Sequence, residues 1–338
     1  MPIALGLAPP VRSLAFRSRL GPNWFRSVKS ALLALGLVLP AQSPAFQEQP
    51  PAGPQLVNRG QFEEALAVFR HDLELQPKSL AANNGAGVAL DLMGRYAEAR
   101  QYFSQAIKAA SRPQDKVLAW RAMAIAWGFA GDCRSAGKYE TDAFELYLTA
   151  GDFYNAGEVA DEMGRLCIDR GDLDRANLDR AMDWYEKGHT TGLLQPDIPQ
   201  VRTDLWNFRW AHARARIAAR RGKTTEARKL LAEAKAILDK GRIPDQTEYF
   251  PYLAGYVAFY AGDYAAALAD LNQANGADPF IQCLMAQTYE KLGNADKAIE
   301  YYRKAAGSTA HSVPAAFAQP FARSKLRQYS ANSTTTEQ

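Results

Sequence analysis

The chain has 338 residues, of which 47% are hydrophobic and 22% are charged, the proportions of an ordinary globular protein. Its formal net charge is +4, but residues 1–45 carry five basic side chains and no acidic one, which leaves 35 basic and 36 acidic side chains in the rest. Because that remainder has almost no net charge, its composition gives no support to nucleic-acid binding.

Residues 1–45 predict a signal peptide. A basic stretch precedes the apolar run ALLALGLVL at 31–39, and Ser43 and Ala45 stand at the −3 and −1 places of a cut before Phe46. The run is about half of the roughly 20 residues that span a bilayer, which favours a cleaved signal over a retained anchor. We therefore expect an exported protein, periplasmic or extracellular, with no stable membrane span after cleavage. The Pro-rich residues 46–54 predict an extended linker.

One pattern then recurs seven times: a glycine followed five residues later by an alanine. Glycine closes a helix because it tolerates the left-handed conformation of the final turn. An Asp or Asn after it can cap the next helix, and the small alanine lets two antiparallel helices approach closely. The pattern predicts successive helical hairpins at Gly60/Ala65, Gly94/Ala99, Gly131/Ala136, Gly171/Ala176, Gly222/Ala227, Gly262/Ala267 and Gly293/Ala298.

Four segments carry a family resemblance. Residues Leu80–Ala110, Tyr249–Pro279 and Ile281–Ala306 resemble complete tetratricopeptide repeat (TPR) units, and Gly60–Pro77 resembles the second helix of one. The resemblance covers Gln55–Ala306. It implies an all-α fold, a right-handed superhelical solenoid of about six to seven helix-turn-helix units over residues 55–308.

The repeat departs from the family pattern in places. Pro50, Pro51 and Pro54 interrupt the first helix of the first unit. The longest interval holds an extra helical turn and a loop at 189–200. Past the repeats we expect a closing helix at 309–328 that covers the last apolar face, then a disordered polar tail at 329–338.

The cysteines and histidines give no sign of a metal or catalytic site. Cys133, Cys167 and Cys283 lie in apolar helical contexts, which fits buried thiols, although contact between adjacent repeats would also permit a Cys133–Cys167 bridge. The four histidines, at 71, 189, 212 and 311, have no partners at metal-ligand spacing. Acidic pairs such as Asp161–Glu162 fit solvated helix faces. We predict no enzyme activity and no cofactor or metal.

In the TPR family the first helix of each unit lines the concave groove, which implies a partner-binding site on two such helices. Its predicted residues are Tyr249, Tyr252, Tyr256, Phe259 and Tyr260 on one helix, and Arg209, His212, Arg216 and Arg220 on the preceding one. An aromatic floor beside a basic wall would suit an extended peptide with acidic groups or a C-terminal carboxylate. The alternative is that these aromatics pack against neighbouring repeats and the arginines are solvated.

The favoured function is a non-enzymatic scaffold in the cell envelope that binds a protein or extended peptide on the concave face. A carbohydrate- or cell-wall-binding module, with the tyrosines as a stacking platform, is the alternative. The residues fix neither the partner's identity nor the oligomeric state.

Overall fold

The computed structural model describes residues 52–168 and 175–336, which belong to one compact unit. The predicted signal peptide, its cut site, most of the predicted linker and Gly171 lie outside these residues. The described residues contain no strand, and no helix among them is long and apolar enough to cross a membrane.

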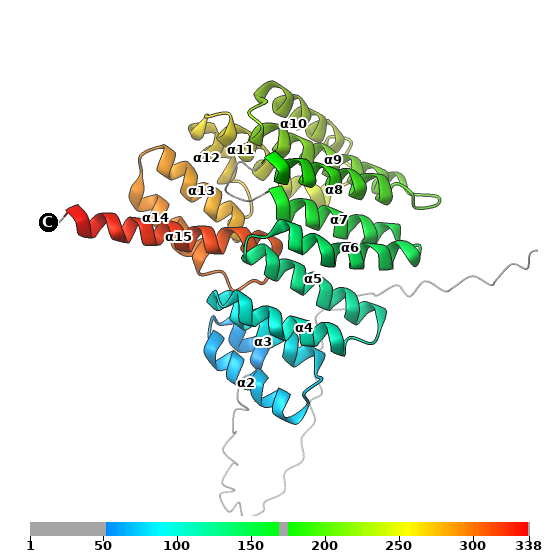
Figure 1. Ribbon diagram of the computed structural model, residues 1–338. Coiled ribbons are helices and arrows are strands. Elements are labelled where there is room, and N and C mark those ends of the chain that lie inside the picture. Colours follow the sequence, from blue (N-terminus) through cyan, green and yellow to red (C-terminus); the bar gives the residue numbers. More distant parts are fainter. Residues whose placement is uncertain (1–51, 169–174, 337–338) are drawn as a thin grey trace, which may run out of the picture. The chain divides into compact units, whose positions relative to one another are not determined.

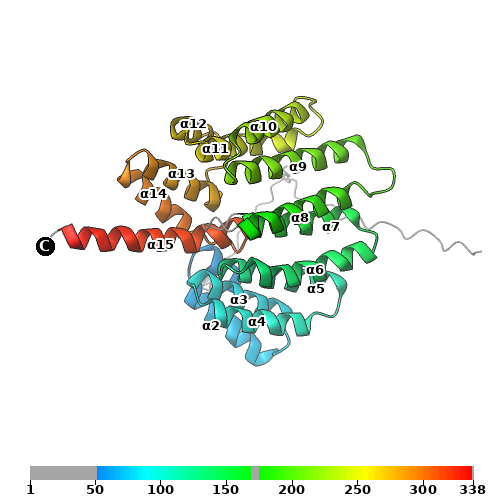
Figure 2. The ribbon, with the colours of Figure 1, turned by 45° about the horizontal axis from the view of Figure 1, so that its top comes forward.

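The helices follow one another in antiparallel hairpins, and each hairpin packs against the next (Figures 1 and 2). The predicted all-α repeat solenoid is confirmed. In chain order the elements are α1 (Gly53–Asn58), α2 (Phe62–Leu75), α3 (Leu80–Met93), α4 (Tyr96–Ala109), α5 (Pro113–Phe129), α6 (Cys133–Thr149), α7 (Phe153–Ile168), α8 (Arg175–Gly192), α9 (Gln200–Arg220), α10 (Thr224–Leu238), the 3-10 helix η1 (Pro244–Tyr249), α11 (Phe250–Tyr260), α12 (Tyr264–Leu271), α13 (Pro279–Lys291), α14 (Ala295–Ala306) and α15 (Val313–Thr336).

The glycine–alanine pattern acts as predicted. Gly94 ends α3 with φ = 88°, and the amide of Arg95 donates to the carbonyl of Leu90, which closes the last turn. Ala99, five residues after this glycine, is completely buried, as are the corresponding Ala65, Ala136, Ala227, Ala267 and Ala298. The predicted caps are confirmed at Asp132, Asp263 and Asn294, whose side chains accept from the first turns of α6, α12 and α14.

Two irregular regions differ in extent from the prediction. A short α1 forms because Pro54 occupies the first turn, where a missing amide proton costs no hydrogen bond. The long loop predicted at 189–200 shrinks to residues 193–199, since α8 and α9 extend into it from both sides.

The C-terminal prediction was wrong for the tail. The helix α15 continues through residues 329–336, where we expected disorder. Tyr329 ties this part down, because its hydroxyl donates to Glu290 of α13 over 2.8 Å. Besides α13 and α14, α15 also packs against α5 and α7 near the middle of the chain, a contact visible in both ribbon views.

A disulfide joins Cys133 at the start of α6 to Cys167 near the end of α7, with 5.2 Å between the Cα atoms. Of the alternatives that the sequence left open, the bridge is therefore the one the structure contains. Cys283 is buried in α13. The bridge fastens two consecutive hairpins to each other.

We expect Gly94→Val to lower the free energy of unfolding by about 1 to 3 kcal/mol, because a β-branched residue is strained at positive φ. Gly276→Val is the matched control, since Gly276 has no positive φ and open space around its Cα. Urea titration followed by circular dichroism measures both. Equal losses in the two variants would contradict a role for the turn conformation.

Reduction of the Cys133–Cys167 bridge is expected to cost about 3 to 4 kcal/mol of stability, the chain-entropy value for a loop of this length. Denaturation with and without dithiothreitol measures the loss. The Cys133→Ala/Cys167→Ala double variant should be insensitive to dithiothreitol. A wild-type midpoint that reductant leaves in place would contradict the expectation.

Candidate binding pocket

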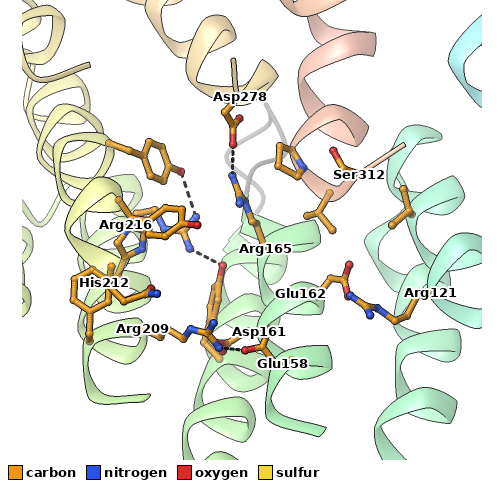
Figure 3. A pocket seen from close by; sticks show the side chains of 18 of the residues that line it. Arg121, Glu158, Asp161, Glu162, Arg165, Arg209, His212, Arg216, Asp278 and Ser312 are labelled. Carbon is orange, nitrogen blue, oxygen red and sulfur yellow. Dashed lines mark hydrogen bonds and ion pairs between the residues drawn. The ribbon is translucent and has the colours of Figure 1, made fainter. Parts of the chain in front are cut away.

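A pocket of about 590 Å³ lies between α5, α7, α9 and α11, the first helices of four consecutive hairpins (Figure 3). Tyr185 of α8, residues of η1, the N-cap of α13, and residues 311–314 at the start of α15 complete its wall. Its lining consists of Arg121, Ile125, Glu158, Asp161, Glu162, Arg165, Tyr185, Phe208, Arg209, His212, Arg216, Gln246, Tyr249, Tyr252, Asp278, His311, Ser312, Val313 and Pro314.

Ion pairs tie the helices together across this pocket. Arg121 of α5 contacts Glu162 of α7 over 2.6 Å, and Arg209 of α9 pairs with Glu158 of α7. Arg165 of α7 lies 3.7 Å from Asp278, which caps α13. Figure 3 shows Arg209 and Glu158 pointing toward each other on one side and Arg165 reaching toward Asp278 on another. These ion pairs therefore join α7 to α5, to α9 and to the start of α13.

Arg216 occupies the deepest basic position. Arg216 is 4% exposed, and its guanidinium donates to the hydroxyls of Tyr185, over 2.6 Å, and of Tyr252, over 3.4 Å. These hydrogen bonds connect α9 to α8 and α11. This buried cation places a positive charge at the pocket wall.

His212 lies one turn before Arg216, between the rings of Phe208 and Tyr252 at 5.8 and 5.6 Å. Burial, with the positive charges of Arg216 and Arg165, lowers the pKa of His212 well below its usual value. The ring is therefore neutral at neutral pH. Its Nε2 atom has no hydrogen-bond partner among the described residues, so the ring retains unused hydrogen-bonding capacity beside the pocket.

The acidic side of the pocket is partly neutralised. Burial raises the pKa of Asp161 to about 7, against the opposing effect of Arg209. Burial also raises the pKa of Glu162. Behind them the fully buried Glu140 has a pKa well above its usual value, because of burial first and the neighbouring Glu162 second. Because Asp161 is partly protonated near pH 7, the carboxyl groups of the pocket do not fully offset its arginines, which favours an anionic group.

Five of the nine predicted site residues meet in this pocket: Arg209, His212, Arg216, Tyr249 and Tyr252. Tyr249 stands at its edge and is 47% exposed, whereas Tyr252 is buried. Because Arg216 and Tyr252 support the fold, Tyr249 is the position where a substitution tests binding with least damage.

The other four predicted residues do not line the pocket. Tyr256 and Phe259 are buried in the core, where Tyr256 packs on Tyr260 and stacks with Phe280. Arg220 is buried too and donates to the hydroxyl of Tyr260 over 3.0 Å. Tyr256 and Phe259 therefore pack against neighbouring residues, as the alternative interpretation expected. Arg220 is buried, whereas that interpretation expected it to be solvated.

The sequence interpretation missed the acidic and basic residues of α7. Glu158, Asp161, Glu162 and Arg165 stand at i, i+3, i+4 and i+7, which places them on one helix face. We had assigned the Asp161–Glu162 pair to a solvated face, but that face points into the pocket. The helical spacing of these four charged residues was the feature of the sequence that could have indicated a shared site. Among the residues that the structure describes, no cluster of His, Cys, Asp and Glu could hold a metal ion.

Comparison with known proteins gives a consistent picture. Tetratricopeptide repeat models match residues 52–116 and 281–310. A tetratricopeptide repeat protein from Parabacteroides merdae is 14% identical, with 80% of this chain and 96% of that chain covered and a TM-score of 0.45. A putative kinesin light chain from Podosopora anserina is 15% identical over 56% of this chain and 92% of its own, with a TM-score of 0.42. Such scores carry no property of those proteins to this chain. No curated protein sequence matches significantly.

The raised pKa of Asp161 predicts a pH-dependent stability. The folded state keeps this proton up to about pH 7, whereas the unfolded chain loses it near 3.8, so the free energy of unfolding falls as pH rises between these values. Asp161→Asn removes that decline. The free energy of unfolding of the variant, relative to the wild type, should therefore be about 1 to 2 kcal/mol higher at about pH 8 than at about pH 5. Urea titrations at both pH values measure the gain. Glu64→Gln on α2 controls for loss of one carboxyl group. A gain no larger than that of the control would contradict the assignment.

Proposed function

The chain is a tetratricopeptide repeat protein, and from this premise we propose that it is a non-enzymatic scaffold that holds a partner protein by an extended, anionic segment in the pocket between α5, α7, α9 and α11. The observation that carries the proposal is the pocket itself: arginines of α5, α7 and α9 line it, and burial raises the pKa of Asp161 on its acidic side to about 7. An acidic side chain or a terminal carboxylate would receive charge-assisted hydrogen bonds there.

The mouth of the pocket suits a peptide better than a glycan. A sugar ring stacks on an open aromatic face, and of the predicted tyrosine stripe Tyr252, Tyr256 and Phe259 are buried. Tyr249 at the edge supplies apolar area with a polar tip, as partner-binding tyrosines do. The packing of the stripe therefore favours the protein partner over the carbohydrate alternative.

We further propose that the protein works outside the cytoplasm. The basic and apolar leader supports export. The Cys133–Cys167 bridge supports it independently, because disulfides persist in oxidising compartments.

A photo-crosslinking residue at Tyr249 tests the pocket. In the native host, the crosslinker at this position should capture one partner protein, and a crosslinker at Leu75 should not, since Leu75 is 70% exposed on α2 but lies away from the pocket. Capture of the same protein from both positions would contradict a pocket-specific contact.

The charge of the partner is tested by a matched pair at the same position. Tyr249→Glu should weaken binding of the captured partner about tenfold, because it places a like charge beside an anionic segment. Tyr249→Lys removes the same ring and should bind more tightly than Tyr249→Glu. Equal affinities of the two variants, measured by biolayer interferometry, would show that the segment in the pocket is not anionic.

A further inference from the structure

The segment before α15 reaches back across the chain to α3. His311 Nε2 lies 2.9 Å from Asp91 Oδ2, and these residues are 220 positions apart. Both are buried, and the imidazole also packs against the rings of Phe103 and Phe129 at 5.4 and 5.3 Å. The C-terminal segment is therefore anchored on the second and third hairpins.

A second polar anchor lies within α15 itself. Arg323 donates to the carbonyl of Leu92 over 2.6 Å, in the last turn of α3. Carbonyls of a last turn have no partner within their own helix, and a cation there also complements the helix dipole. Between the two anchors Ala316 lies so close to α5 that a Cβ added to Gly128 would be 3.2 Å from it.

This docked segment forms one wall of the binding pocket. His311, Ser312, Val313 and Pro314 all line it, and Figure 3 shows Ser312 on the side of Arg121 and Glu162. In repeat solenoids each unit contacts its neighbours. In this protein, by contrast, residues 311–314 near the C-terminus are needed to complete a pocket that is otherwise formed by hairpins in the middle of the chain.

The contact between α15 and the earlier hairpins borders an open pocket. This second pocket, of about 290 Å³, lies between α15, α7 and the α5–α6 turn and is lined by Leu166, Phe317 and Phe321 among others. Pro320 of α15 borders the same pocket and cannot donate a backbone hydrogen bond to the preceding turn. Two polar anchors and the buried side chains of Val313, Ala315 and Ala316 therefore hold this segment in place beside an open pocket.

We propose that the segment 308–323 is a detachable latch, which releases from α3 and α5 to admit a partner segment and redocks to close the pocket over it. The proposal rests on the proposed function for what enters the pocket. Release of the latch breaks only contacts within this chain, so it can be measured without a partner.

Hydrogen exchange on the intact protein tests the latch. Arg323→Ala removes one anchor, and Arg327→Ala, an exposed arginine one turn later on α15, is the matched control. We expect the first variant to speed exchange of the α15 amides at 316–323 about tenfold or more, with α9 amides unchanged. The control variant should change neither. Equal acceleration in α15 and α9 would mean that α15 opens with the whole molecule, and the latch would be disproved.

Crosslinking from Tyr249 separates the two proposals. In the Arg323→Ala background, capture of the partner should fall severalfold, and the Arg327→Ala background should leave it unchanged. If α15 exchanges as a separate unit but the wild type captures no partner, the scaffold function fails and the latch stands. If the wild type captures a partner while α15 exchanges only with the whole molecule, the latch fails and the function stands.

Discussion

Close approach between the two helices of each hairpin is the constraint on which the rest of the structure depends. A Cβ added to Gly87 of α3 would lie 2.7 Å from the Phe103 ring of α4, and one added to Gly164 of α7 would lie 2.8 Å from the Tyr185 ring of α8. Large rings of second helices fill the space that these glycines leave on first helices. The tight pairing turns the opposite faces of the first helices away from their partners, and α5, α7, α9 and α11 together enclose a pocket with those faces.

The chemistry of the pocket follows from this placement. A helix face that is neither in the core nor fully in water must pair its charges, and the arginines of α5 and α9 find their carboxylates on α7. The pairing is incomplete on the acidic side, where burial favours protonated Asp161 and Glu140. Four arginines and four carboxyl groups line the pocket, so the protonated fraction of Asp161 leaves a small excess of positive charge near pH 7. The same groups that set the helix spacing also set the preference for an anion.

The sequence predicted what is local and missed what is distant. Glycine, cap and alanine lie within six residues of one another, so the turn at Gly94 and the burial of Ala99 could be predicted. The stripe containing Tyr256 could be assigned to a helix but not to a side of it, because both the core and the groove accept tyrosine. The contact of His311 with Asp91 joins residues 220 positions apart, and no periodicity encodes it. The pocket wall supplied by the C-terminal segment was invisible for that reason.

Two kinds of interaction hold the walls of the pocket, a disulfide on one side and non-covalent contacts on another. The Cys133–Cys167 bridge fixes α7, which carries Glu158, Asp161, Glu162 and Arg165, to α6 by a covalent bond. The wall supplied by the C-terminal segment is held by hydrogen bonds of His311 and Arg323 and by burial of Val313, Ala315 and Ala316. Because non-covalent contacts can exchange with water and a disulfide cannot, the proposed latch assigns the motion to the C-terminal wall. A scaffold built in this way keeps its recognition groups in register while its entrance opens.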